Sequence, residues 1–194
     1  MRLFVAIELD DHARAAIAEE QHRLRDALGI GRDEAWIPPE RMHLTLAFLG
    51  EVKEPHLSEV IRATGSSVDA SPFTLGFGGL GAFPPRGAPR VIWIGTTTGS
   101  PEAIAVQRMI AERLHGAGIA LERRRFHPHI TLARWRSARP ADAARIRAID
   151  NRREVARGHV DHVTLFESRL SPRGATYTAL AQAPLIGLPP PTVQ

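Results

Sequence analysis

The sequence predicts an α/β fold in which two similar lobes face each other across a cleft. Short apolar runs that are typical of strands alternate with segments that are typical of helices. The order of these segments is repeated once along the chain. Each copy also contains the motif His-x-Thr-Leu, which begins at His43 in the first copy and at His129 in the second.

The first half begins with an apolar run from Leu3 to Ile7 that predicts a buried strand. Asp10 or Asp11 can cap the following helix, which we expect to continue to about Leu28, before Gly29 and Gly31. A loop that contains two prolines precedes the next strand. The remaining predicted elements of this half are a strand over 42–50, a helix from Pro55 to about Val68 and a strand that starts over 73–77.

The second half repeats this order. Its predicted elements are a strand over 91–94, a helix from Ser100 to about His115, a strand over 129–135, a helix that opens at Pro140 and a strand that begins over 159–166. Corresponding landmarks lie 88, 86 and 87 residues apart, in the pairs Phe4 and Ile92, His43 and His129, and Phe73 and Val160. These nearly equal separations indicate an internal duplication.

We therefore predict one domain over 1–194, with repeats over approximately 1–88 and 89–183. One more strand is expected over 176–181, without a counterpart in the first repeat. The tail over 184–194 is rich in proline, and we expect it to be poorly ordered. A monomer is expected, because the internal duplication already supplies a pair of lobes.

The composition is that of a globular cytoplasmic protein, with 43% hydrophobic residues, no cysteine and no apolar run long enough to span a bilayer. The net charge of +4 is uneven, at −3 over residues 1–100 and +7 over 101–194. A basic half suits a polyanionic partner such as RNA. Only Lys53 among the 25 cations is not arginine, so a codon bias gives the same excess and charge alone does not identify the partner.

The paired His-x-Thr-Leu motifs carry the prediction of chemistry. On a strand, His43 and Thr45 point to one face while the intervening leucine points to the other, and the same holds for His129 and Thr131. If the lobes face each other, the two imidazoles converge on one cleft. One neutral imidazole can then take a proton from an attacking oxygen at phosphorus while the other, protonated, gives one to the leaving oxygen. The threonine hydroxyls can donate to the phosphoryl oxygens, and this arrangement requires no metal or cofactor.

The paired motifs resemble those of the 2H phosphoesterases. The surrounding stretches RLFVAIEL, WIPPERMHLTLAFLGEV, PRVIWIG and FHPHITLARW are most similar to the RNA 2′,3′-cyclic phosphodiesterases, also called 2′-5′ RNA ligases. The resemblance spans nearly the whole chain. It implies two α/β lobes with antiparallel sheets and outer helices around a central cleft.

The resemblance also implies an activity, namely hydrolysis of a 2′,3′-cyclic phosphate at RNA ends, tRNA fragments among them, to a 2′-phosphomonoester. It assigns His43 as the proton donor to the leaving 3′-oxygen and His129 as the base, although the symmetry of the motifs permits the reverse. Joining of RNA ends through a 2′-5′ linkage would be the same chemistry with a 5′-hydroxyl in place of water. Arg134 matches a phosphate-binding arginine of the family, but strict alternation from His129 points it to the opposite face unless a bulge redirects it.

Several alternatives stay open at this point. The same histidine pair could act on a small cyclic nucleotide or on a 2′-5′ linked oligonucleotide, or the cleft could bind RNA without catalysis. His127 and His129 could chelate a metal, but without a nearby carboxylate they make a poor site. The arginines over 123–125 and Phe126 could guide or stack on RNA, or could be ordinary surface and packing residues. His12, His22, His56, His115, His159 and His162 form no pattern that indicates a function.

Overall fold

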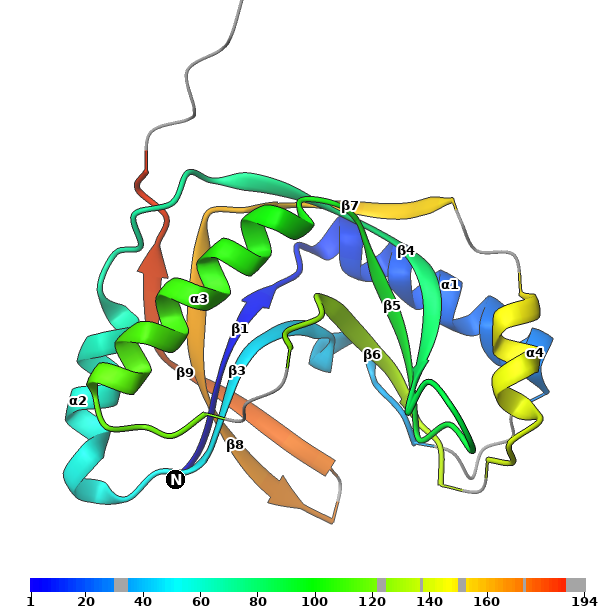
Figure 1. Ribbon diagram of the computed structural model, residues 1–194, viewed down its shortest axis with the longest axis horizontal. Helices are drawn as coiled ribbons and strands as arrows, with labels where there is room; N and C mark the ends of the chain where they lie inside the picture. The colour runs from blue at the N-terminus through cyan, green and yellow to red at the C-terminus, as the bar shows by residue number, and fades with distance from the viewer. Residues whose placement is uncertain (30–34, 122–124, 137, 150–152, 173, 188–194) are drawn as a thin grey trace, which may run out of the picture.

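The computed structural model describes residues 1–29, 35–121, 125–136, 138–149, 153–172 and 174–187 of the chain. It is a curled antiparallel sheet flanked by helices, which confirms the predicted fold class (Figure 1). The helices are α1 (Asp11–Leu28), α2 (Glu54–Gly65), α3 (Ser100–Gly116) and α4 (Asp142–Ala148), with the 3-10 helix η1 (Pro39–Arg41). The strands are β1 (Arg2–Glu8), β2 (Ala35–Trp36), β3 (His43–Glu51), β4 (Phe73–Phe83), β5 (Val91–Thr98), β6 (His129–Arg134), β7 (Glu154–Val160), β8 (His162–Ser171) and β9 (Gly174–Pro184). None of the described helices is long and apolar enough to cross a membrane.

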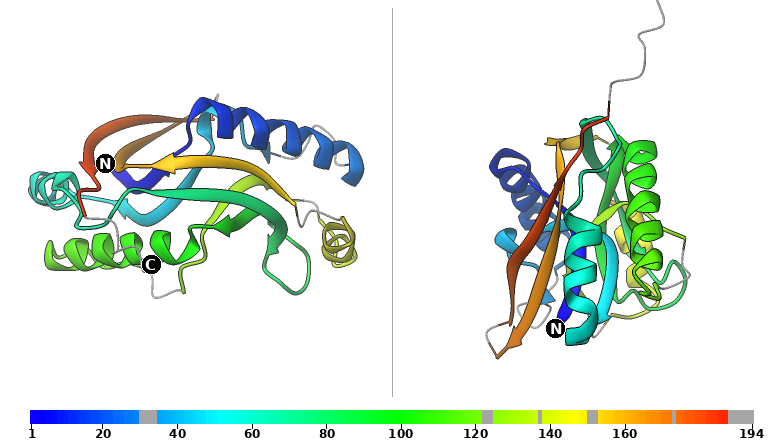
Figure 2. Two further views of the ribbon diagram at one scale, coloured as in Figure 1. Left: turned by 90° about the horizontal axis from the view of Figure 1, so that it is seen from above. Right: turned by 90° about the vertical axis from the view of Figure 1, so that its left-hand side faces the viewer.

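The sheet runs in the order β7-β4-β5-β6-β3-β1-β8-β9, with β2 paired to β6. We call β3, β1, β8 and β9 the β1 lobe, and β6, β5, β4 and β7 the β5 lobe. Helix α2 packs against β8 and β9 and helix α3 against β3, so both cover the β1 lobe. Helices α1 and α4 cover the β5 lobe through β7 and β4, which places the two helix pairs at opposite ends of the molecule (Figures 1 and 2).

The two lobes exchange segments that are distant in sequence. Strand β4 follows β1 and β3 along the chain, yet it pairs with β5 and β7 in the other lobe. In the same way, β8 follows β5 and β6 but pairs with β1. Helix α1 also comes from the first half of the sequence and packs on the β5 lobe, whereas α3 comes from the second half and packs on the β1 lobe. Neither lobe is therefore built from one continuous half of the chain.

Most predicted elements lie close to where the sequence places them. Helix α1 begins after Asp10, whose carboxylate accepts a hydrogen bond of 2.7 Å from the backbone N–H of Ala13. It ends at Gly29, which has a left-handed conformation with φ of 58°. Apolar side chains along one stripe of this helix, such as Ile17 and Leu24, are buried in the core. Gly31 lies outside the described residues.

Three expectations about the second half and the tail need correction. The single strand expected over 159–166 is two strands, because the chain leaves the β5 lobe at Val160, passes Asp161 and enters the β1 lobe at His162. Helix α4 begins at Asp142 rather than at Pro140. The tail does not begin at Pro184, which is the last residue of β9. Beyond it, Leu185 is buried and forms a bridge with Val68, and the part of the tail over 188–194 lies outside the described residues.

The lobes join where β3 lies beside β6. The pairing is antiparallel and is registered at Leu44 and Ile130, whose side chains are both fully buried. In each strand, the residues just before and just after this pair point to the opposite face of the sheet. The histidine and threonine of each motif therefore share the face opposite this buried pair.

Each of these two central strands contains a β-bulge at the same place in its motif. In β3, Leu46 is the extra residue between the pairs Ala6↔Thr45 and Val5↔Ala47. In β6, Leu132 is the extra residue between Trp93↔Thr131 and Ile92↔Ala133. A bulge shifts the alternation of side chains by one residue. Phe48 and Arg134, each five residues after its histidine, consequently turn to the same face as that histidine.

The bulge in β6 is held by a buried amide. The side-chain nitrogen of Gln21, from α1, donates hydrogen bonds of 2.8 Å to the carbonyl oxygens of Leu132 and Ile37. The backbone N–H of Ile37 donates a further bond of 2.9 Å to the Leu132 carbonyl. Gln21 is 6% exposed, so water does not replace these bonds.

We expect Gln21→Met to lower the free energy of unfolding by about 1–3 kcal/mol, because the thioether keeps the volume but removes the hydrogen bonds to the carbonyl oxygens of Leu132 and Ile37. Urea unfolding measures this change. The matched control is Glu19→Met, at an exposed position of the same helix, for which we expect a change within about 0.5 kcal/mol. Equal stability of the two variants would show that the amide does not hold the bulge.

Candidate active site

The five side chains that the sequence indicates are brought together in one cleft. A pocket of about 340 Å³ opens on the concave face at the junction of β3 and β6. Its walls include His43, Thr45, His129, Thr131 and Arg134. Because β3 and β6 are antiparallel about the Leu44–Ile130 pair, each histidine lies beside the threonine of the other motif. The two histidines are then diagonal neighbours, at about 7–8 Å between backbones.

Both imidazole rings are oriented in the same way. Nδ1 of His43 lies 2.8 Å from the carbonyl oxygen of Arg41, and Nδ1 of His129 lies 2.6 Å from that of His127. A carbonyl oxygen only accepts hydrogen bonds, so Nδ1 carries the proton in each ring. This leaves Nε2 of each ring as the atom that can take up or release a proton in the cleft.

Aromatic side chains fix the planes of the two rings. His43 stacks on Phe4 at 4.8 Å between centroids, and the edge of Tyr177 approaches it at 5.3 Å. His129 has Phe83 at 5.2 Å and Trp93 at 5.8 Å. These packed surroundings limit rotation of the rings and exclude water from their faces.

The same burial disfavours the charged imidazolium form. It lowers the pKa of His43 to about 4, although the hydrogen bond to Arg41 and the negative charge of Glu8 act to raise it; the charge of Arg134 lowers it further. Burial also lowers the pKa of His129 below its usual range. Here the hydrogen bond to the His127 carbonyl raises the pKa and the charge of the His127 ring lowers it. Both imidazoles are thus neutral near pH 7 in the unliganded protein.

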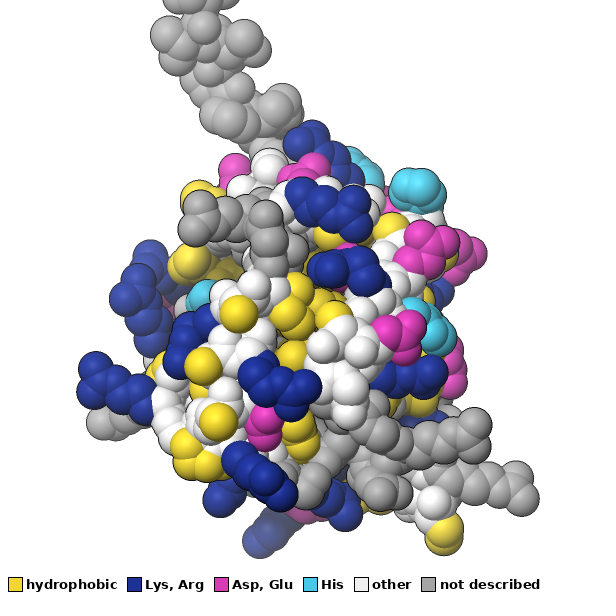
Figure 3. All heavy atoms as spheres, turned by 90° about the vertical axis from the view of Figure 1, so that its right-hand side faces the viewer, with side chains coloured by type: hydrophobic (Ala, Val, Ile, Leu, Met, Phe, Trp, Pro, Cys, Tyr) yellow, Lys and Arg dark blue, Asp and Glu magenta, His cyan; other side chains and the backbone are white. Residues whose placement is uncertain are grey.

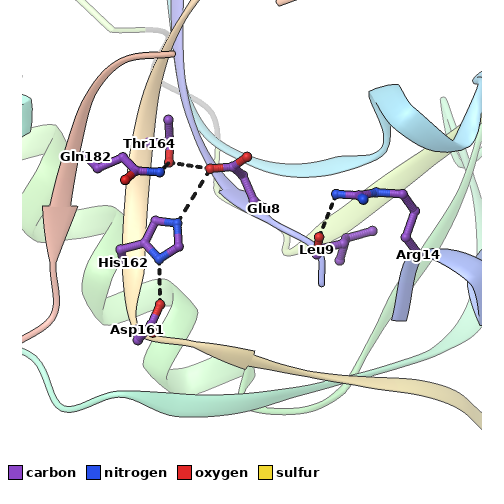
Figure 4. A network of polar contacts seen from close by, with 7 residues as sticks. All are labelled: Glu8, Leu9, Arg14, Asp161, His162, Thr164 and Gln182. Atoms are coloured by element: carbon purple, nitrogen blue, oxygen red, sulfur yellow. Dashed lines mark hydrogen bonds and ion pairs between the residues drawn. The ribbon is translucent and has the colours of Figure 1, made fainter. Parts of the chain in front are cut away.

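A polar network around Glu8 (Figure 4) adjoins one of the two histidines, His43. Glu8 is paired in register with His43 across β1 and β3. Its carboxylate accepts a hydrogen bond of 2.6 Å from the hydroxyl of Thr164 and lies 3.5 Å from Nε2 of His162. The other ring nitrogen of His162 lies 2.5 Å from the carboxylate of Asp161. The residue paired with His129 is Gly95, so no carboxylate occupies the matching place in the β5 lobe.

Sequence reasoning missed this network. Glu8 ends the first strand and His162 belongs to a set of histidines without a pattern, so nothing local marks either residue. The register of β1 with β3 and with β8 is what brings Glu8 to His43 and to Thr164. The duplication could have provided a clue, because an acid stands at the end of the first strand and not at the corresponding end of the strand over 91–98.

The cleft is positively charged. Arg2, Arg41 and Arg134 line the pocket with the two histidines, and no Asp or Glu is among the described residues of its walls. Arg side chains are also spread over the end of the molecule at α1 and α4 (Figure 3). A site of this charge attracts anions such as phosphate.

Two exposed apolar side chains also face this pocket. The ring of Phe48 is 47% exposed, and Leu170 is 69% exposed. The guanidinium carbon of Arg2 lies 5.1 Å from the centre of the Phe48 ring. Phe48 and Arg134 occupy matching positions after the two bulges, so the cleft presents an aromatic ring on one side and a cation on the other.

The remaining predicted residues lie around this cleft. Arg125, Phe126 and His127 line a second, adjoining pocket, whereas residues 123 and 124 lie outside the described part of the chain. His127 contacts Trp93 and stacks near His129, at 6.0 Å between ring centroids. Among the described residues, no group of three or more His, Cys, Asp or Glu side chains could hold a metal ion.

Comparison with known proteins identifies the family. A sequence model of the 2′-5′ RNA ligase superfamily matches residues 6–171. The chain belongs to this superfamily. A member from Archaeoglobus fulgidus, named RNA 2′,3′-cyclic phosphodiesterase, is 33% identical over 180 residues, which are 93% of this chain and 98% of that protein.

Solved structures agree with this assignment. The crystal structure of TT0787 of Thermus thermophilus superposes with a TM-score of 0.79 at 29% identity, covering 96% of this chain and 99% of that one. Escherichia coli LigT complexed with 3′-AMP gives a TM-score of 0.76 at 28% identity, covering 95% of this chain and 97% of that one. The family resemblance seen in the sequence is confirmed.

Burial keeps the two imidazoles neutral in the folded protein. As the pH falls below 6.5, the same histidines therefore take up protons in the unfolded chain before they do so in the folded protein. We therefore expect the free energy of unfolding to fall between about pH 6.5 and pH 4, with His43 contributing a slope of up to about 1.4 kcal/mol per pH unit.

Urea unfolding at several pH values in this window, for the wild type and His43→Gln, measures this contribution. The variant should show a shallower fall, whereas the control His12→Gln, at an exposed position of α1, should follow the wild type. Identical pH slopes for His43→Gln and the wild type would show that the pKa of His43 is not lowered in the folded protein.

Proposed function

We propose that the protein hydrolyses the 2′,3′-cyclic phosphate at RNA ends to a 2′-phosphomonoester, with His43 and His129 as a general acid and base pair. The observation that carries this proposal is the convergence of two His-x-Thr motifs on one cationic cleft, with Nδ1 of each imidazole bound to a backbone carbonyl oxygen. The names of the relatives support the same substrate class. A cytoplasmic location and a monomeric state stay predictions from the sequence.

In the proposed reaction, Nε2 of His129 accepts a proton from water as the water oxygen bonds to phosphorus. The bond between phosphorus and the 3′-oxygen breaks, and the 3′-oxygen takes the proton from Nε2 of His43. Thr45, Thr131 and Arg134 donate hydrogen bonds to the phosphoryl oxygens, where negative charge builds up. Both proton transfers are made by the imidazole side chains of His43 and His129.

The choice of His43 as the acid rests on Glu8. An acid must hold a proton before the reaction, and burial works against the imidazolium form of both rings. Only His43 has a carboxylate paired with it in register, and this negative charge raises its pKa. A bound phosphate anion acts in the same direction. His129, opposite Gly95, lacks such a partner and is better suited to accept a proton.

The exposed side chains of Phe48 and Leu170 suit the nucleobase of the reacting nucleotide. An aromatic face open to solvent gives a platform on which any of the four bases can stack. The relative from Escherichia coli has been solved with 3′-AMP, a nucleotide of matching size. Arg2, over the Phe48 ring, would complete this platform from the side of β1.

Hydrolysis in excess EDTA tests the proposal. Wild type, His43→Ala and His129→Ala are compared on an RNA oligonucleotide and on a mononucleotide, each ending in a 2′,3′-cyclic phosphate. We expect a 2′-phosphate product and a loss of about 10²–10⁴ in rate for each variant. Activity that appears only after metal is added would overturn the two-histidine mechanism, and activity on the mononucleotide alone would favour a small cyclic nucleotide as substrate.

Glu8→Gln tests the assignment of the acid. Without the carboxylate, the pKa of His43 falls further, so less imidazolium is present at neutral pH. We expect kcat/KM to drop by up to about tenfold at pH 7.5, for a change of about one pKa unit, and the loss to become smaller only as the pH falls below about 4, where the imidazolium form of His43 builds up in the wild type.

The control for this experiment is Thr164→Val, which removes a hydrogen bond to Glu8 but keeps its charge. Its pH profile should follow that of the wild type. A loss in Glu8→Gln that stays the same below pH 4 would mean that the carboxylate acts on the structure of the site and not on the proton of His43.

A further inference from the structure

A second pocket opens from the catalytic pocket on the side of the β5 lobe. Its volume is about 730 Å³, more than twice that of the catalytic pocket. The residues that line both pockets are Thr45, Phe48, His129, Thr131 and Arg134, whereas His43 is not part of the walls of the second pocket. One wall is formed by the turn between β4 and β5 and the other by the segment that leads into β6. The pocket therefore lies beyond His129, away from His43.

The chemistry of its walls matches a nucleic-acid chain. Arg90, Arg125 and Arg134 supply guanidinium groups, and no Asp or Glu is among the described residues that line it. Phe83 and Phe126, both half-buried, supply aromatic surface between these cations. Guanidinium groups that pair with phosphates, together with aromatic faces for bases, are what a single-stranded chain requires.

In-line displacement decides which part of a substrate reaches this pocket. The entering and leaving oxygens lie on opposite sides of phosphorus. If His43 protonates the leaving 3′-oxygen, the ribose that carries the cyclic phosphate lies on the side of His43. The entering oxygen then comes from the side of His129. A water molecule occupies only about 30 Å³, so the water that enters in hydrolysis fills a small part of this pocket.

We propose that the second pocket holds the RNA strand whose 5′-hydroxyl enters at phosphorus when the enzyme joins ends, and which leaves when a 2′-5′ linkage is cleaved. In joining, the 5′-oxygen bonds to phosphorus and gives its proton to His129, while the 3′-oxygen leaves with the proton of His43. The products are a 2′-5′ phosphodiester and a free 3′-hydroxyl, and no further reactant is needed. This inference rests on the proposed function and on its assignment of the acid and the base.

The test uses separate RNA oligonucleotides for the donor strand and the acceptor strand. The donor is an RNA oligonucleotide that ends in a 2′,3′-cyclic phosphate, and the acceptor is an RNA oligonucleotide with a 5′-hydroxyl. Hydrolysis of the donor alone and formation of the 2′-5′ linkage are measured for wild type and for Arg90→Ala/Arg125→Ala. Both arginines are exposed, so the double variant should fold. The control is Arg108→Ala/Arg147→Ala, which removes two exposed arginines that are not part of either pocket.

We expect Arg90→Ala/Arg125→Ala to raise the KM for the acceptor strand by about tenfold or more. The dependence of acceptor binding on salt should also weaken, by about two units in the slope of log K against log salt. Hydrolysis of the donor should stay within about threefold of the wild type, since a surface change away from the reacting atoms has little effect on them. The control variant should match the wild type in both assays.

Two outcomes would overturn the inference. Equal losses in hydrolysis and in joining would mean that the pocket holds the donor strand, on the 5′ side of the cyclic phosphate. An unchanged KM for the acceptor would mean that the pocket holds neither strand. Both results differ from failure of the proposed function, in which the wild type does not hydrolyse the donor at all.

Discussion

The antiparallel contact of β3 with β6 is the constraint on which the site depends. Leu44 and Ile130 are fully buried on one face, and this fixes the four polar side chains of the two motifs on the other. A shift of one residue in this register would turn both histidines into the core. The contact also joins the two lobes, so the same pairing that completes the sheet forms the candidate active-site cleft.

Much of this arrangement could be predicted from the sequence, because it depends on local patterns. Asp10 and Gly29 mark the ends of α1, and the two motifs at matching positions indicate a shared site. The direction of Arg134 could not be predicted, since it depends on the bulge at Leu132, and that bulge is held by Gln21 from a distant helix. The role of Glu8 likewise depends on the register between strands and leaves no mark in its own segment.

The site combines rings that resist protonation with a cleft that attracts anions. Burial lowers the pKa of both histidines, and arginines along the walls add positive charge. An anionic substrate supplies the opposite charge that an imidazolium needs. In the proposed mechanism, the proton is then held most firmly when a phosphate is present, so that substrate binding promotes protonation of the acid. Glu8 makes this coupling unequal between two otherwise similar histidines.

The exchange of β4 and β8 between the lobes has a consequence for how such a chain could arise. A peptide with only one repeat would carry its third strand away from its own sheet and leave an open edge beside β1 or β5. Two copies of that peptide could close both edges by trading those strands, as a domain-swapped homodimer with one motif from each copy. Tandem fusion of the two genes would preserve this swap within a single polypeptide. The two halves could then diverge in sequence. After the bulge, the first half now has Phe48 and the second half has Arg134.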